Sequence, residues 1–489
     1  MNLLKILQRS ESNGPTVLDP TIVELPGDLE TPVSAYLKLE SVGARFLLES
    51  AEGPKSVGRY TFIGISPTHR IDIHRHHSKV SGSDGVVDIP HDSEDAPFTA
   101  LKKILRGISL SGDVPHLSLL GGIVGYLGYD CVPFFESRIP FPENGDEPLG
   151  SFYLVDTLLV FDHFQRKIKI INVGEKDDAS SVTRTNDLLE RIRAALHGPV
   201  RIPQTLVIDS NTEFESNLRQ DEFEKIVEES RKNIYSGNVF QIVPSQVLSG
   251  DTNADSFQIY RALRMLNPSP YMFYLDFGSM ELIGSSPEAL VKLNDRKAIL
   301  RPIAGTRRRG HSDDEDNGLA DELCRDEKER AEHVMLVDLG RNDLGRICKY
   351  GSVSVQDFMR LEYYSHVMHL TSTVTGQLRD GADQFDLFRA VFPAGTVSGA
   401  PKVKAMELID EFEPTRRGPY AGAIGYFSLS GNMDMCIAIR TIVKKGQRAF
   451  LQAGAGIVAD SIPELEYKET LNKIAAIKEA IRLAEEGLR

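Results

Sequence analysis

Two pairs of glutamates have the clearest capacity for chemistry in this sequence. The pairs are Glu329 with Glu332 and Glu466 with Glu469. Each pair is three residues apart in a segment whose pattern predicts a helix, so both carboxylates share one helical face. Two helices that present carboxylates to one cleft would suit Mg²⁺, which takes oxygen ligands. The alternative is a solvated helix surface, where Lys328, Arg330 and Lys468 would supply ion-pair partners.

Two glycine-rich turns could hold an anionic ligand. Gln452–Gly456 (QAGAG) follows a predicted strand, and Gly395–Lys402 (GTVSGAPK) precedes a predicted helix. Glycine lets backbone N–H groups approach an anion closely, and a helix N-terminus favours negative charge. Neither run has the spacing of a nucleotide-phosphate loop, so the turns fit a carboxylate better than a nucleotide. Ordinary tight turns are the alternative interpretation.

A third candidate is the pair His366 and His369, in a run predicted as a strand. Side chains alternate between the faces of a strand, so residues three apart point to opposite faces and cannot share a metal ion. One of the two histidines is free to transfer protons near neutral pH. The alternative is a structural hydrogen-bonding role.

The composition narrows the class of protein that must position these residues. The chain has 489 residues, with 56 basic and 70 acidic side chains and a formal charge of −14. Nucleic acids and anionic membranes are bound by basic patches, so neither is an expected partner. The four cysteines are far apart and form no zinc motif, and no apolar run is long enough to span a membrane. We therefore expect a cytoplasmic protein with reduced thiols.

The chain is expected to form two regions, an N-terminal one over residues 1–200 and a catalytic domain over residues 215–489. Short β-branched and aromatic segments, such as Phe152–Phe161 and Met433–Val443, predict strands. The polar stretch Ser78–Ala96 predicts a surface loop. Helices are predicted over Asp326–Leu344 and Pro463–Glu486. Because most strands follow one another directly, we predict an α+β fold with mainly antiparallel sheets.

Eight short runs together resemble the chorismate-utilising enzymes, in that family's order and over nearly the whole chain. The runs are Ser285–Ala289 (SSPEA), Arg301–Thr306 (RPIAGT), Glu332–Asp343 (EHVMLVDLGRND), His366–Ser372 (HVMHLTS), Gly395–Lys402, Gly422–Tyr426 (GAIGY), Gln452–Gly456 and Glu466–Lys473 (EYKETLNK). The resemblance implies the chorismate-utilising fold, in which large antiparallel sheets form a sandwich with helices packed outside. It also implies an Mg²⁺ cofactor and chorismate as substrate.

The resemblance assigns a role to each candidate residue. Glu332 and Glu469 would ligate Mg²⁺, with Glu329 and Glu466 nearby through water. Glu288 would be the general acid that protonates the departing hydroxyl, His369 would remove a ring proton, and Thr396 belongs to the catalytic set. The residues that would bind the substrate are Gly305, Thr306, Tyr420, Arg440, Gly454, Ala455, Gly456 and Lys473.

Two positions indicate which reaction of the family to expect. Members that add water carry a lysine base where this chain has Gln241, and aminodeoxychorismate synthases commonly carry lysine where Ala304 stands. Without either lysine, the resemblance implies that ammonia attacks C2 of chorismate to give anthranilate and pyruvate. The open alternatives are an aminodeoxychorismate synthase, an isochorismate or salicylate synthase, and a catalytically inactive regulatory subunit.

The resemblance also implies regulation and a partner. Leu47–Ser50 (LLES) and Asn267–Met272 (NPSPYM) resemble the tryptophan feedback site of the anthranilate-forming branch. The implied effector residues are Leu48, Glu49, Ser50, Asn267, Pro270, Tyr271 and Met272. No G-x-C-x-G nucleophile motif surrounds any cysteine, so a separate glutamine amidotransferase subunit would supply ammonia. A heterotetramer of two large and two small subunits is expected.

Overall fold

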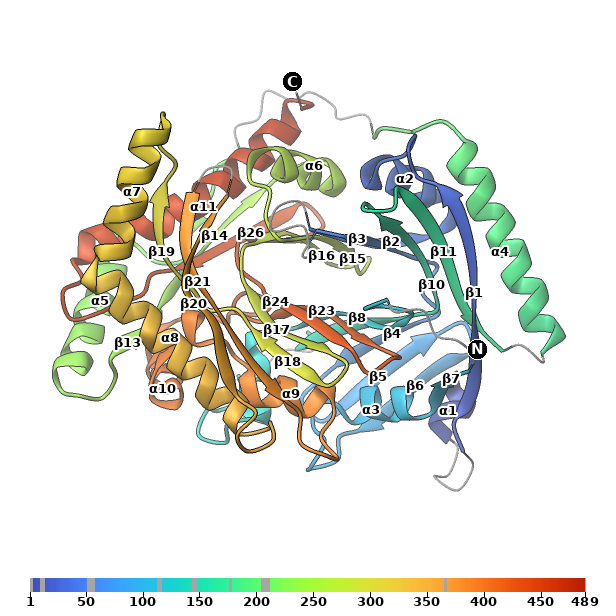
Figure 1. Ribbon diagram of the computed structural model, residues 1–489, viewed down its shortest axis with the longest axis horizontal. Coiled ribbons are helices and arrows are strands. Elements are labelled where there is room, and N and C mark those ends of the chain that lie inside the picture. Colours follow the sequence, from blue (N-terminus) through green and yellow to red (C-terminus); the bar gives the residue numbers. More distant parts are fainter. Residues whose placement is uncertain are drawn as a thin grey trace.

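The computed structural model describes residues 3–8, 14–50, 58–111, 117–142, 147–175, 178–203, 212–364 and 367–488. Within these residues, two twelve-stranded sheets lie face to face (Figure 1). The first sheet has the order β12 (Glu215–Ser216), β14 (Ser245–Asp251), β26 (Arg448–Gly454), β25 (Thr441–Lys445), β16 (Glu281–Ser286), β15 (Tyr271–Asp276), β2 (Ala44–Glu49), β3 (Tyr60–Ile65), β10 (Thr157–Asp162), β11 (Lys167–Gly174), β1 (Thr16–Pro26) and β7 (Ile108–Leu110).

The second sheet has the order β19 (Ile303–Arg308), β21 (Val367–Gln377), β18 (Lys297–Leu300), β17 (Ala289–Asn294), β24 (Met433–Ile437), β23 (Ala423–Ser428), β8 (Gly122–Leu127), β9 (Gly150–Val155), β4 (His69–Ile73), β5 (His77–Gly82) and β6 (Gly85–Pro90), with β20 (Ser354–Tyr363) added on β21. A short pair, β13 (Gln241–Ile242) and β22 (Gly399–Ala400), stands apart. Most pairings are antiparallel, and β1 with β7 is parallel. The predicted α+β class is confirmed.

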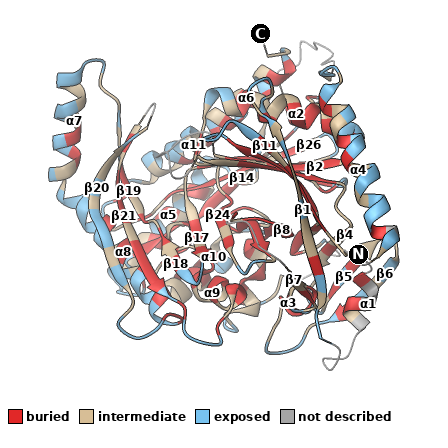
Figure 2. Ribbon diagram, turned by 45° about the vertical axis from the view of Figure 1, so that its right-hand side comes forward, coloured by how far each residue is buried: buried red, intermediate tan, exposed pale blue. Residues whose placement is uncertain are grey.

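Helices cover the outside of this sandwich. They are α1 (Leu3–Gln8), α2 (Pro32–Leu39), α3 (Thr99–Arg106), α4 (Ala179–His197), α5 (Gln220–Tyr235), α6 (Ser256–Leu266), α7 (Asp313–Arg325), α8 (Glu327–Gly345), α9 (Gln384–Val391), α10 (Lys402–Phe412) and α11 (Pro463–Glu485). Figure 2 shows buried strands in the middle and exposed residues along α4 and α7. No helix in the described part of the chain is long and apolar enough to span a membrane.

The chain passes directly from one sheet to the other at several turns. Pro287 and Glu288 join β16 in the first sheet to β17 in the second, and residues 438–440 join β24 to β25 in the opposite direction. These two turns bond to each other, because the Ile437 N–H donates to the Glu288 carbonyl (3.0 Å) and the Ser285 N–H donates to the Arg440 carbonyl (3.1 Å). Each turn carries one residue of the predicted site.

Three sequence predictions of single elements were wrong. Phe152–Phe161 contains two strands, β9 and β10, which lie in different sheets, and Met433–Val443 likewise spans β24 and β25. Each turn is short, with Asp156 alone in the first and residues 438–440 in the second, and it lies between two runs of mainly apolar residues, so the composition suggests one continuous strand. The predicted loop Ser78–Ala96 contains most of the β5–β6 hairpin, whose polar residues occupy the edge of the second sheet.

The two halves of the chain visit the sheets in the same order. The first half runs through β2–β3, β4–β5, β8–β9 and β10–β11, and the second through β15–β16, β17–β18, β23–β24 and β25–β26. The halves meet where β2 pairs with β15 and β8 pairs with β23. Two short runs recur at equivalent places: Gly-x-Ser-Pro at Gly64 and Gly284, and Gly-x-x-Gly-Tyr at Gly122 and Gly422. Both sheets therefore contain strands from both predicted regions, and the boundary between the regions stays a prediction.

Aromatic side chains fill the core beneath the second sheet. The Phe427 ring lies 4.5 Å from that of Phe385, 5.9 Å from that of Phe388 and 6.0 Å from that of Phe152, measured between ring centroids. Phe427 is fully buried. It therefore joins β23, β9 and α9 into one cluster.

Replacing Phe427 with alanine is expected to lower the free energy of unfolding by about 3–5 kcal/mol, because the lost ring leaves a cavity between rigid neighbours. Phe164→Ala is the matched control, since Phe164 is 81% exposed and its loss should change stability by less than about 0.5 kcal/mol. Urea unfolding followed by circular dichroism compares the two. Equal losses would contradict the placement of Phe427 at the centre of the core.

Candidate active site

Glu288 lies in the turn from β16 to β17, where the chain changes sheets. The Thr396 hydroxyl, which η3 (Gly395–Val397) positions, donates to the Glu288 Oε1 at 3.0 Å. Removal of the carboxyl from water raises the pKa of Glu288 to about 7, and the bond from Thr396 opposes this rise. A carboxyl with this pKa is substantially protonated at neutral pH, so it can act as an acid.

His369 lies on β21 beside a bulge in the neighbouring strand β19. The pairing of the two strands shifts between Ala304 and Thr306, and Gly305 has a φ of +69°. His369 Nδ1 lies 3.1 Å from the Gly305 carbonyl oxygen and 3.1 Å from the Thr306 Oγ1. Because a carbonyl oxygen only accepts, the proton of a neutral ring sits on Nδ1 and Nε2 keeps its lone pair. Burial lowers the pKa of His369, which favours this neutral form.

The four predicted metal-binding glutamates project from α8 and α11. Burial raises the pKa of Glu332, and the charges of Glu329 and Glu469 raise it further. Burial and the charge of Glu469 likewise raise the pKa of Glu466. The charges of Glu329 and Glu469 thus act on Glu332, and the charge of Glu469 acts on Glu466. The acidic residues of α8 and α11 therefore face the same region of the molecule.

Basic residues hold two of these carboxylates. Glu469 pairs with Lys473 at 2.6 Å, and Glu329 pairs with Arg307 at 3.2 Å. In the described part of the chain, no three acidic, histidine or cysteine side chains are grouped closely enough to hold a metal ion. The oxygen donors suit Mg²⁺ in kind. For three of them to close on an ion, at least one of these ion pairs would have to open.

A third group of predicted residues surrounds the end of β26. Lys473 Nζ donates to the Gly454 carbonyl at 2.9 Å, and Arg440 Nη1 donates to the Lys473 carbonyl at 2.6 Å. The Tyr420 hydroxyl lies against Gly454, where a Cβ would be only 3.0 Å from it. Burial lowers the pKa of Arg440. Two cationic side chains and a glycine-rich turn are thus held together, as binding of a carboxylate would require.

Gln241 connects the glycine-rich turn to the carboxylates. It is buried on β13, and its amide hydrogen bonds to Glu332 and so lowers that residue's pKa. A Cβ on Gly456 would meet the Gln241 Nε2 at 2.8 Å, so only glycine fits there without displacement of the amide. The glutamine thus lies where the metal-binding and carboxylate-binding groups meet. His366, from the same motif as His369, is outside the residues that the structure describes.

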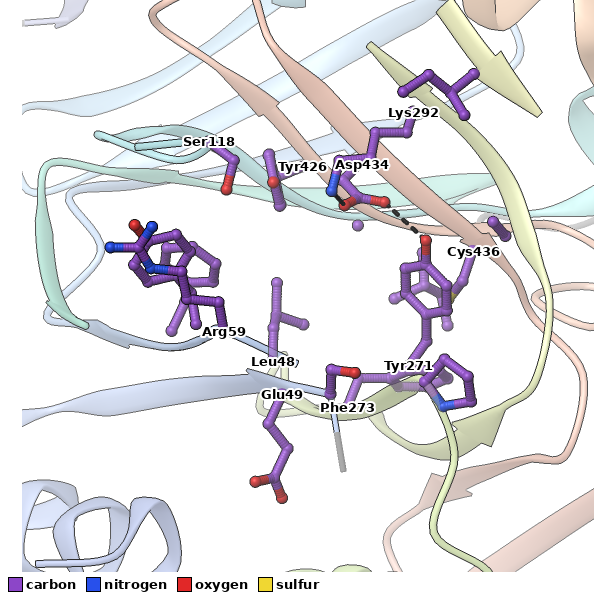
Figure 3. Close-up of a pocket in the computed structure, with 18 of the residues that line it drawn as sticks. Leu48, Glu49, Arg59, Ser118, Tyr271, Phe273, Lys292, Tyr426, Asp434 and Cys436 are labelled. Carbon is purple, nitrogen blue, oxygen red and sulfur yellow. Dashed lines mark hydrogen bonds and ion pairs between the residues drawn. The ribbon is translucent and has the colours of Figure 1, made fainter. Parts of the chain in front are cut away.

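The predicted effector residues line a separate cavity of about 640 Å³ between the two sheets (Figure 3). Six of the seven line it: Leu48, Glu49, Ser50, Pro270, Tyr271 and Met272. Asn267 is not among the lining residues, and its carbonyl accepts a hydrogen bond from Ser285. Figure 3 shows the Glu49 side chain pointing away from the cavity, so Glu49 contributes only its backbone.

Sequence reasoning missed the polar centre of this cavity. Asp434 on β24 pairs with Lys292 on β17 at 2.9 Å and accepts a hydrogen bond from the Tyr271 hydroxyl at 3.0 Å (Figure 3). The sequence did contain a signal for this pair, because each of the two strands has one charged residue among mainly apolar ones. It also missed Arg307, which holds Glu329, because consecutive arginines (Arg307–Arg309) are typical of a solvated surface.

The cavity also touches the elements that carry the catalytic residues. Pro287 and Ala289 line it on either side of Glu288, and Tyr364 lines it while its ring meets that of His369 edge-on with centroids 5.5 Å apart. A ligand in the cavity would therefore contact the neighbours of both residues. The cavity and the candidate catalytic residues therefore share adjoining residues.

Comparison with known proteins relates the chain to one family over most of its length. The family model for chorismate binding enzymes matches residues 43–479. Anthranilate synthase component 1 of Aquifex aeolicus (strain VF5) is 44% identical over 482 residues, which are 96% of this chain and 95% of that protein. The crystal structure of anthranilate synthase component I from Streptococcus pneumoniae TIGR4 is 37% identical, with a TM-score of 0.77, and covers 93% of this chain and 98% of its own.

A more distant structure shares the fold alone. The menaquinone-specific isochorismate synthase from Escherichia coli is 20% identical, with a TM-score of 0.69 over 98% of both chains. The sandwich is therefore common to proteins with different activities, so the assignment of an activity depends on the residues of the site.

The environment of Glu288 predicts a pH-dependent effect on stability. The folded-state pKa of about 7 exceeds the ordinary value of 4.5, so the folded protein binds the extra proton. This contribution is fully present below about pH 4.5 and is lost as the pH rises through about 7. Glu288→Gln should therefore match the parent protein near pH 4.5 and exceed its stability near pH 8, by on the order of 3 kcal/mol.

Thermal unfolding at a series of pH values measures this difference. Glu228→Gln, at an exposed position of α5, is the control and should show no such trend. Thr396→Val removes the hydrogen bond that lowers the pKa of Glu288. This variant should therefore lose the stability contribution of Glu288 at a higher pH than the parent protein does. A stability difference between Glu288→Gln and the parent that did not change with pH would show that folding does not raise the pKa of Glu288.

Proposed function

The chain belongs to the chorismate binding enzyme family, and we propose that it is the component of an anthranilate synthase that converts chorismate and ammonia to anthranilate, pyruvate and water. The observation that carries the proposal is the near-complete match to anthranilate synthase component 1, at 44% identity over 96% of the chain. The site agrees with it, because a neutral amide, Gln241, stands where the water-adding members have a basic lysine.

Glu288 supports the first stage of this reaction. Ammonia adds to C2 of the ring, the double bonds shift and the C4 hydroxyl departs. Hydroxide is a poor leaving group, so the hydroxyl needs a proton as its bond breaks, and it then leaves as water. Glu288 is the residue suited to supply that proton, because burial raises the pKa of its carboxyl to about 7, so that a large fraction is protonated near neutral pH, and Thr396 orients it.

His369 supports the second stage. The C2 proton is removed, the bond to the enolpyruvyl oxygen breaks, pyruvate leaves and the ring becomes aromatic. The neutral imidazole has its lone pair on Nε2, because Nδ1 is held by the Gly305 carbonyl. His369 is therefore suited to accept the proton, and the hydrogen bond at Nδ1 stabilises the imidazolium that forms.

Four glutamates and two basic residues are assigned to substrate positioning. Glu332 and Glu469 would hold Mg²⁺, with Glu329 and Glu466 nearby, and the ion would supply positive charge for the ring carboxylate of chorismate. Arg440 and Lys473, with the Gly454–Gly456 turn, would bind the carboxylates directly. The Glu469–Lys473 pair links the two sets, so metal binding would release Lys473 for the substrate. Gly305, Thr306 and Tyr420 shape the same space.

A glutamine amidotransferase subunit is the proposed source of ammonia, in a complex of two large and two small subunits. The relatives' designation as component 1 agrees with a partner, and the stoichiometry comes from the family resemblance. Free ammonia at high concentration should replace the partner. The cytoplasmic location likewise stays a prediction of the sequence.

The cavity between the sheets is proposed to bind L-tryptophan as a feedback inhibitor. Its volume of about 640 Å³ and its aromatic and apolar walls suit an indole ring, and the Lys292–Asp434 pair offers charges for an amino acid. Because Pro287, Ala289 and Tyr364 adjoin the catalytic residues, a ligand that favours one arrangement of these walls can change activity.

Purified protein supplied with chorismate, Mg²⁺ and ammonium should form anthranilate, detected by its fluorescence and by chromatography. Glu288→Gln should lower kcat by about 10²–10⁴-fold, the range for loss of a general acid. Glu332→Gln and chelation of Mg²⁺ should also remove activity, whereas the surface variant Glu479→Gln should retain it. Aminodeoxychorismate or isochorismate as product would overturn the assignment.

Tryptophan should inhibit the enzyme, and Ser50→Leu should raise the inhibitory concentration by about tenfold or more, because the larger side chain occupies space that the ligand needs. Ser41→Leu, an equal change at an exposed serine outside the cavity, is the control. Activity at increasing tryptophan concentration compares the three proteins. Unchanged inhibition of the Ser50 variant would show that tryptophan binds elsewhere or not at all.

A further inference from the structure

A second hollow, of about 480 Å³, lies on the outer face of the first sheet, opposite the cavity between the sheets. The β10–β11 turn, the first turn of α2 and the last turns of α6 enclose it, and stacked rings of Tyr36 and Phe257, 4.3 Å apart, join the two helices. The lining residues are Gly27, Glu30, Thr31, Pro32, Val33, Phe161, Asp162, His163, Arg166, Lys167, Arg261, Arg264 and Met265.

The charged residues of this hollow are not balanced. Its two carboxylates are already neutralised, Glu30 by Lys38 and Asp162 by Arg59. Lys167 pairs with Glu24 at 2.6 Å, and Arg264 pairs with Glu49 at 2.6 Å.

Two arginines of the hollow remain without an acidic partner among the described residues. Arg261 donates to the amide oxygen of Gln258, and Arg166 is held through its backbone, whose carbonyl accepts from the Gly27 N–H at 3.0 Å. The site thus has two uncompensated guanidinium groups. Their ordinary partners are oxyanions.

We propose that this hollow is a binding site for a small oxyanion, a ligand with a phosphate or carboxylate group. A guanidinium presents donors in a planar fork that matches two oxygens of such a group. Arg166 and Arg261 supply two forks from different elements, so one anion would bridge the β10–β11 turn and α6. The apolar side of the hollow, formed by Val33, Phe161 and Met265, leaves room for an uncharged part of the ligand.

Arg264 connects this hollow to the cavity between the sheets. Its Nε and Nη2 donate to the two Glu49 carboxylate oxygens at 2.6 and 3.2 Å, and Tyr260 also donates to this carboxylate. The Glu49 side chain is only 3% exposed, and among the described residues Arg264 is the basic residue that forms an ion pair with it. Glu49 stands between Leu48 and Ser50, which line the inner cavity (Figure 3).

An anion in the hollow would therefore compete with Glu49 for Arg264. A buried carboxylate that loses its cationic partner is destabilised, so the end of β2 would shift and the inner cavity would change shape. Coupling of this kind is reciprocal, since each ligand changes the affinity of the other by the same factor. This second step rests on the proposed function, in which the inner cavity binds tryptophan.

The binding site itself is tested by calorimetric titration of the full chain with inorganic phosphate and, separately, with acetate, at constant ionic strength. Saturable binding of one anion per chain is expected. The double variant Arg166→Gln, Arg261→Gln should lose it, and Arg325→Gln, on the exposed face of α7, should keep it. Binding of phosphate alone would assign a phosphate ligand, and binding of acetate alone a carboxylate. No binding of either, or binding unchanged in the double variant, would overturn the proposal.

The coupling is tested by tryptophan binding without chorismate, followed by the fluorescence anisotropy of the ligand, because the chain contains no tryptophan. Saturating anion should raise the Kd for tryptophan about fivefold, the lower range of typical couplings. The double variant should show no change. An equal Kd with and without anion would overturn the coupling but not the anion site. Absence of tryptophan binding in both conditions would instead contradict the proposed regulation.

Discussion

The hydrogen bonds between the two turns that cross from sheet to sheet set the geometry of the catalytic cleft. Glu288 accepts from Ile437 through its backbone, and Arg440 accepts from Ser285, so neither turn can move without the other. One turn carries the carboxyl that can donate a proton, and the other carries a guanidinium that can bind a carboxylate. The strands on either side of each turn pair with neighbours in both sheets, which restrains the turns as a preorganised site requires.

Burial shifts the pKa values of the titratable groups near these two turns and so changes which of them are charged. Removal from water raises the pKa of Glu288 to about 7 and lowers the pKa of His369, so it favours the protonated carboxyl and the neutral imidazole, which are the forms that an acid and a base must have before a reaction. Burial also disfavours the charged form of Glu332, and the negative charges of Glu329 and Glu469 add to this effect. A cation would offset this negative charge. Lys473 and Arg307 supply part of the required positive charge within the chain itself, through their ion pairs with Glu469 and Glu329.

The sequence predicted local structure and chemistry better than the path of the chain. Helices with paired glutamates were found because charge spacing and caps are local signals, as at Glu329 and Glu332. The changes of sheet at Asp156 and Ala438 were not predicted, since each turn is only one to three residues long and lies between two runs of mainly apolar residues. The Lys292–Asp434 pair was missed for a similar reason, because its two residues are far apart in the sequence and meet only when β17 pairs with β24.

The repeated order of strands in the two halves has a consequence for how such a protein can change over evolutionary time. One half carries the carboxylates, the histidine and the arginine of the cleft, whereas the equivalent turn of the other half has Thr68 in place of Glu288. That half contributes residues to the cavity and to the outer hollow, together with the second half. A duplicated framework of this kind lets control diverge in one copy while selection on the reaction preserves the other.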